Sequence, residues 1–338
     1  MLRTPLDSLR LIALAASLAA AACAPIVKPA GPVTVEARLA PDRLIATDGR
    51  SLPLRLWLPD NPRAVVVALH GFNEYSEAFD DPGKVLADRG IAVYAFDQRG
   101  FGRSPDHGYW AGTATLADDV AALIRQVAAR HPGTPVYLLG ESMGGALAMV
   151  TLTRTDAPAV QGVILSAPAV WDRDSMGVLQ SGALWIASYT VPWLTLTGQG
   201  LHIMASDNIP MLRRLGADPL VIKETRVDAI HGLCDLMDEA AAAAPRLHVP
   251  ILVLYGTHDQ VVPAEPEYRM MARLPDTPHP PVKAVYENGW HMLMRDLQAN
   301  VVLIDIVAWI DHPDRPLPSG ADRQGWARIE AARGADLP

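Results

Sequence analysis

Gly140-Glu141-Ser142-Met143-Gly144 lies between an apolar run that ends at Leu139 and a helix-like stretch that continues to Thr153. The pattern predicts a sharp turn from a β-strand into a helix, with Ser142 at its tip. A serine hydroxyl is a weak nucleophile unless a base removes its proton and the backbone presents it at an exposed, strained position. Because the pentapeptide can also arise by chance in a chain with 25 glycines, Ser142 needs partners elsewhere in the chain.

An acid and a base follow Ser142 in the chain. The apolar run Ile251 to Gly256 predicts a buried strand, and Asp259 lies just beyond its carboxyl end, where open α/β sheets place functional residues. Another predicted strand ends at Tyr286, and His291 comes soon after it. Ser, Asp, His is the chain order of the triad in α/β-hydrolases. We therefore expect these three residues to form a catalytic triad.

Two backbone amides are expected to bind the oxyanion that forms when Ser142 attacks a carbonyl group. One belongs to Phe72, in the loop after the strand that ends at Leu69, and the other to Met143, the residue after the candidate nucleophile. Backbone amides can serve whatever side chain they carry. Loss of one such donor typically costs about 3 kcal/mol of transition-state stabilisation.

These motifs resemble the monoacylglycerol lipase and lysophospholipase branch of the α/β-hydrolases, often described as serine aminopeptidase S33-like. Between about residues 44 and 311, in the family's order, the matching motifs are His70-Gly71-Phe72-Asn73-Glu74-Tyr75-Ser76, Asp97-Gln98-Arg99-Gly100-Phe101-Gly102-Arg103-Ser104, Gly140-Glu141-Ser142-Met143-Gly144-Gly145, Gly256-Thr257-His258-Asp259 and Gly289-Trp290-His291. The resemblance implies the α/β-hydrolase fold and a serine hydrolase, and it is much less specific for substrate. The family usually has histidine at Tyr75 and often at Glu141, so both departures bear on substrate contacts.

Two other histidines compete with His291 for the role of base. His70 precedes the oxyanion loop and is expected to be a structural hydrogen-bonding residue. His258 adjoins Asp259, but neighbouring residues on one loop point in different directions, whereas the base must reach both acid and nucleophile. The other seven histidines are expected to be exposed or structural. The sequence has no paired metal-ligand spacing, so we expect no metal and no cofactor.

Composition and the order of elements predict the architecture. The chain has 338 residues, half of them hydrophobic, enough for a large folded core. Strand-like and helix-like segments alternate, so the expected fold class is α/β, with a mostly parallel sheet flanked by helices. More than eighty residues separate the strand that ends at Ser166 from the one that begins at Ile251, and we expect an inserted helical cap over about residues 170–245. The formal charge of −8 disfavours nucleic acid as a partner.

The N-terminus has the pattern of an export signal. Two arginines precede an apolar run from Leu11 to Ala22, which is too short to cross a bilayer and is followed at once by Cys23. The pattern resembles a bacterial lipoprotein signal, although Ala20 stands where leucine is typical. We expect a signal peptide over residues 1–22, a lipidated Cys23 in contact with the membrane and a tether over residues 23–32. An ordinary cleavage site of an exported protein is the alternative.

The catalytic domain is expected over residues 33–312, followed by a mobile C-terminal tail over residues 313–338. Near the start of the expected cap lie Trp171, Trp185 and Trp193, three of the eight tryptophans. Most apolar residues there should form the cap's own core. A minority should line an apolar groove above the nucleophile, and these three tryptophans are the candidates for contact with substrate.

The sequence therefore predicts an exported serine hydrolase of small-molecule carboxylic esters, of monoacylglycerol or lysophospholipid type. An aminopeptidase or amidase could use the same triad but needs an acidic pocket for the substrate's amine, for which Glu74, Glu141 and Asp172 are available. A non-catalytic binding module on the same fold is a further alternative. It is disfavoured because such modules typically lose a triad residue, and this chain has all three.

Overall fold

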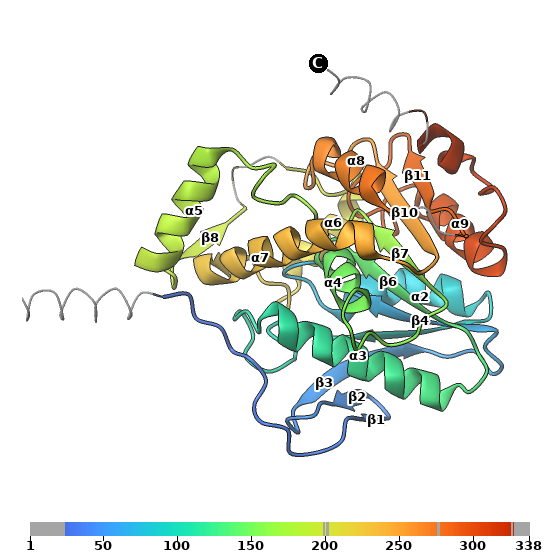
Figure 1. Ribbon diagram of the computed structural model, residues 1–338, viewed down its shortest axis with the longest axis horizontal. Helices are drawn as coiled ribbons and strands as arrows, with labels where there is room; N and C mark the ends of the chain where they lie inside the picture. The colour runs from blue at the N-terminus through green and yellow to red at the C-terminus, as the bar shows by residue number, and fades with distance from the viewer. Residues whose placement is uncertain (1–23, 199, 201–202, 276–277, 326, 328–338) are drawn as a thin grey trace, which may run out of the picture.

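The computed structural model describes residues 24–198, 200, 203–275, 278–325 and 327, and its centre is a nine-stranded sheet between layers of helices (Figure 1). The strands of this sheet are β1 (Arg38–Ala40), β2 (Arg43–Ile45), β3 (Ser51–Trp57), β4 (Ala64–Leu69), β5 (Ile91–Phe96), β6 (Val136–Glu141), β7 (Gly162–Ser166), β10 (Ile251–Gly256) and β11 (Val282–Tyr286). The helices that flank it are η1 (Ser76–Phe79), α2 (Asp80–Ala87), α3 (Thr113–Arg130), α4 (Met143–Leu152), α8 (Ala264–Arg273) and α9 (Ala299–Asp311).

The order of the strands brings the predicted site residues to one edge of the sheet. The order is β1-β2-β3-β5-β4-β6-β7-β10-β11, antiparallel from β1 to β5 and parallel from β5 to β11. Phe72 follows β4, Ser142 follows β6, Asp259 follows β10 and His291 follows β11. Because parallel strands end at the same edge, all four residues lie at the carboxyl end of the sheet. The expected mostly parallel α/β sheet is confirmed.

Alternating residues of the central strands fill two separate cores. In β4, Val65 and Val67 pack with residues of α3, α4 and α8, whereas Val66 and Ala68 pack with residues of α2 and α9. Every residue of β4 is buried, which explains why this strand has a continuous apolar sequence and not an alternating one.

The insertion between β7 and β10 forms a cap over the carboxyl edge of the sheet (Figure 1). Its elements are α5 (Val178–Thr190), β8 (Thr195–Thr197), α6 (Ile209–Ala217), β9 (Glu224–Arg226), α7 (Val227–Ala243) and η2 (Ala244–Arg246). The small strands β8 and β9 pair antiparallel. The second half of α7 is not a separate cap element, because Leu236, Ala240 and Ala243 are buried in the same core as α4. Alanines on α7 and α4 allow the two helices to pack closely.

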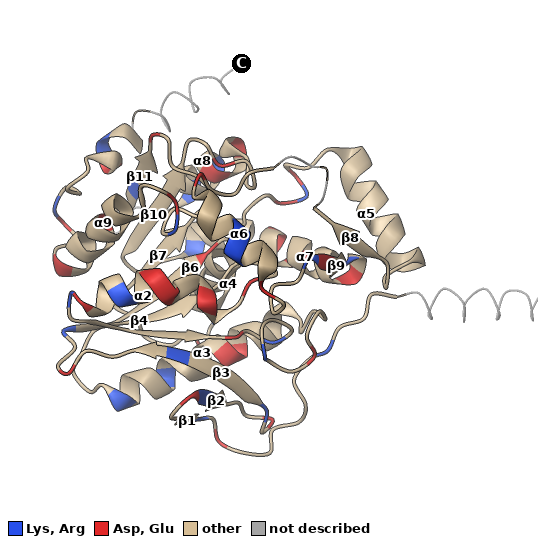
Figure 2. Ribbon diagram, turned by 180° about the vertical axis from the view of Figure 1, so that it is seen from behind, with Lys and Arg blue, Asp and Glu red and all other residues tan. Residues whose placement is uncertain are grey.

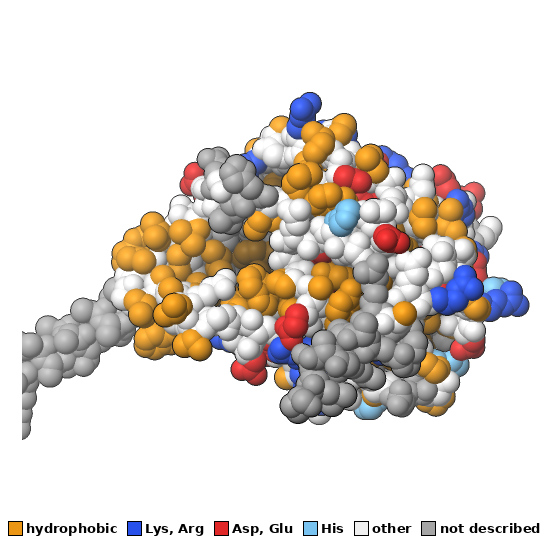
Figure 3. Space-filling model, turned by 90° about the horizontal axis from the view of Figure 1, so that it is seen from above, with side chains coloured by type: hydrophobic (Ala, Val, Ile, Leu, Met, Phe, Trp, Pro, Cys, Tyr) orange, Lys and Arg blue, Asp and Glu red, His pale blue; other side chains and the backbone are white. Residues whose placement is uncertain are grey.

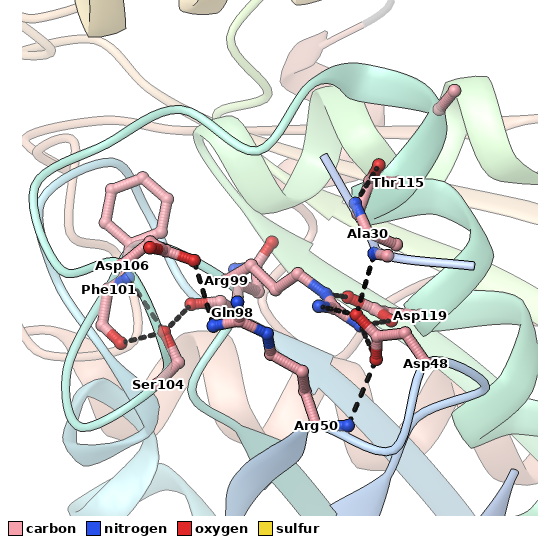
Figure 4. Close-up of polar contacts among 12 residues, drawn as sticks. Ala30, Asp48, Arg50, Gln98, Arg99, Phe101, Ser104, Asp106, Thr115 and Asp119 are labelled. Carbon is pink, nitrogen blue, oxygen red and sulfur yellow. Dashed lines mark hydrogen bonds and ion pairs between the residues drawn. The ribbon is translucent and has the colours of Figure 1, made fainter. Parts of the chain in front are cut away.

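The segment expected to be a tether is docked on the domain. Lys28 N–H donates to Trp110 O at 2.8 Å, and Ala30 N–H donates to Thr115 Oγ1 at 3.2 Å. The next amide, that of Gly31, donates to the carboxylate of Asp48 (Figure 4). The expectation of a free tether is wrong for residues 24–32, because proline-rich composition predicts an irregular backbone but not its contacts. The expected signal peptide and Cys23 lie outside the described residues.

Part of the C-terminal tail is also packed. Leu317 and Ala321 are buried beside α9, and the amide and hydroxyl of Ser319 donate to the carboxylate of Asp305. The expectation of mobility is therefore wrong for residues 313–325. Among the residues that the structure describes, no helix has the length and apolar character needed to cross a membrane.

Candidate active site

Ser142 occupies the turn from β6 into α4 in a strained conformation. Its φ of 54° and ψ of −117° lie in a region that non-glycine residues rarely adopt, at a cost of order 1–3 kcal/mol. Two neighbours hold this conformation: Ser142 N–H donates to Ser166 O at 2.9 Å, and Ser142 O accepts from Ala169 N–H at 2.9 Å. The side chain is thereby presented at the carboxyl edge of the sheet.

Glycines beside Ser142 allow α4 to approach the sheet closely. A Cβ atom on Gly144 would lie 2.1 Å from the carbonyl oxygen of Leu69, and one on Gly140 would lie 2.3 Å from the carbonyl oxygen of Gly144. Any side chain at either position would force α4 away from the sheet. The two glycines of the pentapeptide are therefore required by packing on both sides of the serine.

His291 and Asp259 form a buried hydrogen-bonded pair. His291 Nδ1 lies 2.7 Å from Asp259 Oδ2, and Asp259 Oδ1 accepts from the amides of Val261 and Val262 at 2.7 and 2.9 Å. Burial alone lowers the pKa of His291, but the negative charge and hydrogen bond of Asp259, together with the charges of Glu141 and Glu74, outweigh it, so the pKa is raised above its ordinary value. With Nδ1 bound to Asp259, Nε2 is left as the atom that can accept a proton.

Ser142 and His291 line one cavity of about 730 Å³, the size of a small-molecule site. Other lining residues are mostly apolar and come from the sheet loops and the cap: Phe72, Trp171, Met176, Leu184, Leu215, Val221, Ile230, Leu233, Met237, Val262 and Met292. The structure thus places Ser142 and His291 at the wall of an apolar cavity, with Asp259 buried behind His291.

The predicted oxyanion loop lies against the nucleophile. A Cβ atom on Gly71 would lie 3.5 Å from Ser142 Cβ, and Phe72, the next residue, lines the cavity together with Ser142. Met143 is the first residue of α4, where backbone N–H groups have no partner within the helix. Both amides are therefore near Ser142.

The three candidate tryptophans differ in position. Trp171 lines the cavity, but Trp185 and Trp193 are 59% and 54% exposed and are not among its lining residues. The side of α5 that faces the cavity carries Gln180 and Leu184 instead. The sequence indicated an apolar helix here but not which of its sides faces the substrate.

The comparison with known proteins agrees with this geometry. Residues 60–298 match the family described as "Serine aminopeptidase, S33". The chain belongs to this family of α/β-hydrolases. The mouse (Mus musculus) protein named monoglyceride lipase is 28% identical to the hydrolase over 284 residues, which cover 80% of this chain and 89% of the relative. The monoacylglycerol lipase of Mycolicibacterium smegmatis is 27% identical over 262 residues, which cover 75% and 91%.

Solved structures show the same fold. The crystal structure of a monoacylglycerol lipase from Paleococcus ferrophilus matches the hydrolase with a TM-score of 0.63 and 24% identity, over 77% of this chain and 98% of that one. A monoglyceride lipase variant from Saccharomyces cerevisiae matches with a TM-score of 0.66 and 18% identity, over 84% and 98%. The expected α/β-hydrolase fold is confirmed.

The two alternative histidines of the hydrolase are not placed as bases. His70 is fully buried; its Nδ1 donates to Gly71 O at 2.8 Å and its Nε2 accepts from Gln98 N–H at 3.1 Å. His258 packs edge-on against Trp290, with ring centroids 5.4 Å apart. His70 therefore holds the start of the oxyanion loop, as expected of a structural residue.

An arginine that the sequence analysis did not single out joins two loops of the site to the end of β6. Arg295, four residues after His291, donates to both carboxylate oxygens of Glu74 at 2.6 and 2.9 Å and also to Glu141. Glu74 lies in the oxyanion loop and Glu141 precedes the nucleophile, so one buried side chain connects them to the histidine loop. The only sequence signal was its position near His291, because its partners are 221 and 154 residues away.

Arg295 and burial act differently on the two glutamates of this cluster. Burial alone would raise the pKa of Glu74, but the Arg295 guanidinium outweighs it and the pKa is lowered. The pKa of Glu141 is raised, chiefly by burial, and its Oε2 has no hydrogen-bond partner. The Arg295 guanidinium therefore outweighs the effect of burial on the pKa of Glu74 but not on that of Glu141. Among the described residues, no group of three or more potential ligands could hold a metal ion.

Proposed function

We propose that the protein is a serine hydrolase that cleaves carboxylic esters of monoacyl lipids, of the monoacylglycerol or lysophospholipid type. The observation that carries the proposal is the position of Ser142 and His291 in the wall of a large apolar cavity. The relatives named monoglyceride lipase and monoacylglycerol lipase support the same chemistry. The cavity is large enough to hold an acyl chain beside the nucleophile.

In the proposed reaction, His291 Nε2 removes the proton of Ser142 as Oγ attacks the ester carbonyl carbon. The amides of Phe72 and Met143 stabilise the negative oxygen of the tetrahedral intermediate. The intermediate collapses, the carbon–oxygen bond to the alcohol breaks, and His291 gives the proton to the departing alcohol. Water then attacks the acyl-enzyme with His291 again as base, which releases the fatty acid. Asp259 holds His291 in the tautomer that this cycle needs.

The electrostatics of the site favour an ester over an aminoacyl amide. An aminopeptidase would need a free carboxylate to bind the substrate's ammonium group. Glu74 and Glu141 both bind Arg295, and the carboxylate of Asp172 binds Ser175. The three acids suggested by the sequence are therefore engaged with other groups.

The N-terminal pattern leads us to propose that the protein is exported and anchored by lipid on Cys23, facing the periplasm or the cell surface. Residue 24 already lies on the surface of the domain, so an acylated Cys23 would leave the folded part in water beside the membrane. Such a location suits an enzyme whose substrate is a lipid.

A serine-directed fluorophosphonate tests the nucleophile. We expect labelling of the wild-type protein and none of Ser142→Ala, with all other serines acting as an internal control. We also expect Ser142→Ala, His291→Ala and the double variant to lose kcat/KM by similar factors, on the order of 10⁴ or more, because the two residues act as one unit. Clearly additive losses, or labelling that persists in Ser142→Ala, would remove this assignment.

A series of p-nitrophenyl esters tests the substrate class. Each buried CH₂ contributes about 0.8 kcal/mol, so kcat/KM should rise from acetyl to medium and long acyl esters. Leu233→Asn, a polar change in the cavity wall, should flatten this rise, whereas Trp193→Asn, outside the cavity, should not. A preference for acetyl esters or for aminoacyl amides would contradict a lipid substrate.

A further inference from the structure

Two aromatic rings pack on the side chain of Phe72, whose amide is a proposed oxyanion donor. The Phe72 ring packs edge-on against Phe101 and Trp110, with ring centroids 5.7 and 6.4 Å apart. Both partners are almost fully buried, and neither lines the catalytic cavity. They belong to residues 97–112, the segment between β5 and α3, which we call the β5 loop. The position of the oxyanion loop therefore depends on where the β5 loop places these two rings.

Trp110 also contacts the cap. A Cβ atom on Gly232 of α7 would lie 2.3 Å from Trp110 Cδ1, so the indole ring occupies the space that a side chain at position 232 would need. The same ring packs on Phe72. One buried side chain thus joins the oxyanion loop to a cap helix without touching the cavity.

The N-terminal segment holds the β5 loop at Trp110. We call residues 24–31 the N-terminal strap. Val27 forms a parallel β-bridge with Trp110, and the amide of Lys28 donates to Trp110 O at 2.8 Å. The ammonium group of Lys28 lies 5.5 Å from the ring centroid of Tyr109, a favourable cation–π distance. These contacts fix the backbone of the β5 loop at the residue whose ring packs on the oxyanion loop.

The strap also holds the β5 loop near Phe101. Gly31 N–H donates to the carboxylate of Asp48 at 3.1 Å, and Arg99 donates to the same carboxylate at 2.7 Å (Figure 4). Arg99 stands two residues before Phe101 and also donates to Asp119 of α3 at 2.6 Å. The side chains of these three charged residues are almost fully buried. Because a buried ion pair is costly to break, this end of the strap is firmly attached.

The strap itself does not line the catalytic cavity. In Figures 1 and 2 it runs from the cap end of the molecule past the start of α3 toward β1 and β2. Figure 3 shows hydrophobic side chains around a hollow beside the end that carries α5, and Gln180 and Leu184 of α5 line the cavity. No residue of the strap, all of which the structure describes, is part of that lining. The strap can therefore affect catalysis only through the residues that it holds.

We propose that Trp110 is a positioning residue of the oxyanion hole and that the N-terminal strap holds it in place. An oxyanion donor must lie about 3 Å from the position of the oxyanion. A displacement of about 1 Å can lower the rate on the order of 10²-fold. The segment between the proposed anchor and the domain is thus part of the structure that supports catalysis. This inference rests on the proposed function, which assigns the amide of Phe72 to the oxyanion hole.

Trp110→Leu tests the ring contact. For a water-soluble p-nitrophenyl ester, kcat should fall about tenfold or more while KM changes less than about twofold, because the residue does not line the cavity. An alkyl trifluoromethyl ketone forms an adduct with Ser142 whose negative oxygen occupies the oxyanion hole. Its affinity should fall by a factor similar to that in kcat/KM. The pH midpoint should not move, because Asp259 and His291 are unchanged. Trp110→Phe, which keeps an aromatic ring, should recover most of the activity.

A double variant, Lys28→Pro with Ala30→Pro, tests the strap in the full-length protein. Proline removes the two amides that donate to Trp110 O and to Thr115 Oγ1. We expect the same kinetic pattern as in Trp110→Leu, with a smaller loss of kcat. The variant leaves every buried side chain in place, so it carries the test even where Trp110→Leu does not unfold cooperatively.

Amide hydrogen exchange reads the oxyanion loop without any substrate. In the strap variant, exchange should be faster than in the wild type over residues 70–76 and unchanged over β10. Val33→Pro is the matched control, because Val33 is exposed and its amide donates to no other residue that the structure describes. It should match the wild type in exchange and kinetics.

Three results would overturn the inference or part of it. Wild-type kcat and ketone affinity in Trp110→Leu would remove Trp110 from the positioning role. Unchanged exchange and kinetics in the strap variant would remove the strap. A moved pH midpoint with unchanged ketone affinity would place the effect at His291 and not at the oxyanion loop. By contrast, faster exchange over residues 70–76 in a protein whose wild type hydrolyses no ester would contradict the proposed function and leave the link between strap and loop intact.

Discussion

Two carboxyl groups besides its hydrogen-bond partner Asp259 affect the pKa of His291. Asp259 is its direct partner, and the carboxyls of Glu141 and Glu74 act on it in the same sense, so together they raise its pKa against the effect of burial. A protonated imidazole cannot accept the proton of Ser142. The pKa of His291 thus depends on acids from three different segments of the chain.

The pH dependence of kcat/KM follows from this arrangement. We expect activity to fall as pH is lowered through the pKa of His291, with a midpoint above the usual value for histidine, because His291 must be neutral to act as base. Asp259→Asn should lower the midpoint and reduce kcat/KM by on the order of 10⁴. Rates on a soluble ester between about pH 5 and 9 measure both effects, and a flat profile would remove His291 from its role.

Arg295 should matter for stability as well as for the geometry of the site. Arg295→Met would leave the buried carboxyls of Glu74 and Glu141 without their cation, at a cost of roughly 3–5 kcal/mol in the free energy of unfolding. Urea denaturation measures the cost, and slower fluorophosphonate labelling of Ser142 would report the loosened loops. Arg50→Met is the control, since Arg50 pairs with Asp106 at an exposed position and should change unfolding little. Equal effects of the two changes would show that Arg295 is not a structural link.

Helix α4 illustrates how close packing limits which side chains a helix can have at its points of contact. It meets the sheet at Gly144, where a Cβ atom would overlap the Leu69 carbonyl oxygen, and it meets the chain after β7 at Gly145, where a Cβ atom would lie 2.8 Å from Pro168 Cβ. Neither contact involves a catalytic group. Both fix the start of the helix, and with it the position of Ser142.

Two glycine-to-alanine changes in helices should therefore have opposite outcomes. Gly144→Ala should lower the unfolding temperature and abolish labelling of Ser142, because α4 must move to accommodate the methyl group. Gly182→Ala in α5 meets no atom within 4 Å, and alanine is favoured over glycine inside a helix by about 1 kcal/mol, so it should leave stability equal or higher. Thermal unfolding of both variants tests the pair. A tolerated Gly144→Ala would mean that α4 is less tightly held than the structure shows.

The proposed lipid anchor concerns the molecule as a whole, since it would decide which way the cavity faces. The docked N-terminal segment fixes where an anchor would emerge, and the cap forms the same end of the protein (Figure 1). An anchor at that end would keep the cavity near the membrane, whereas a free tether would allow any orientation.

Cys23→Ser should release most of the active protein from the membrane fraction of the native host. Each CH₂ of an acyl chain in the bilayer contributes about 0.8 kcal/mol, so loss of the acyl chains should remove most of the affinity for the membrane. Activity and immunoblotting of the two fractions measure the shift. Cys234→Ser, which changes the other cysteine of the chain, should leave the protein in the membrane fraction. Wild-type protein recovered soluble and unacylated would show an exported enzyme without an anchor.

The strands and loops that position the site residues were predictable, because short stretches of sequence indicate each of them. The apolar runs before Ser142, Asp259 and His291 indicated buried strands, and the loops after these strands had to meet at one edge once the sheet was parallel. Gly140 and Gly144 belong to the pentapeptide that indicated the turn, and the structure shows that they allow the close approach of α4. For these features, a few residues that are neighbours in the sequence determine the conformation of the backbone.

Other features depend on which distant segments meet, and no short pattern encodes that. Glu74 and Glu141 bind Arg295 only because β4 and β6 are neighbours and the histidine loop closes over their ends. Trp185 points to solvent because Leu184 and not Trp185 is on the cavity side of α5. The sequence by itself thus determined the sheet and the chain order of the three residues proposed as a triad. Only the tertiary structure decided the ion pairs behind the triad, the cavity wall and the path of the N-terminal segment, because buried charges and exposed apolar side chains acquire their partners from the packing of elements far apart in the chain.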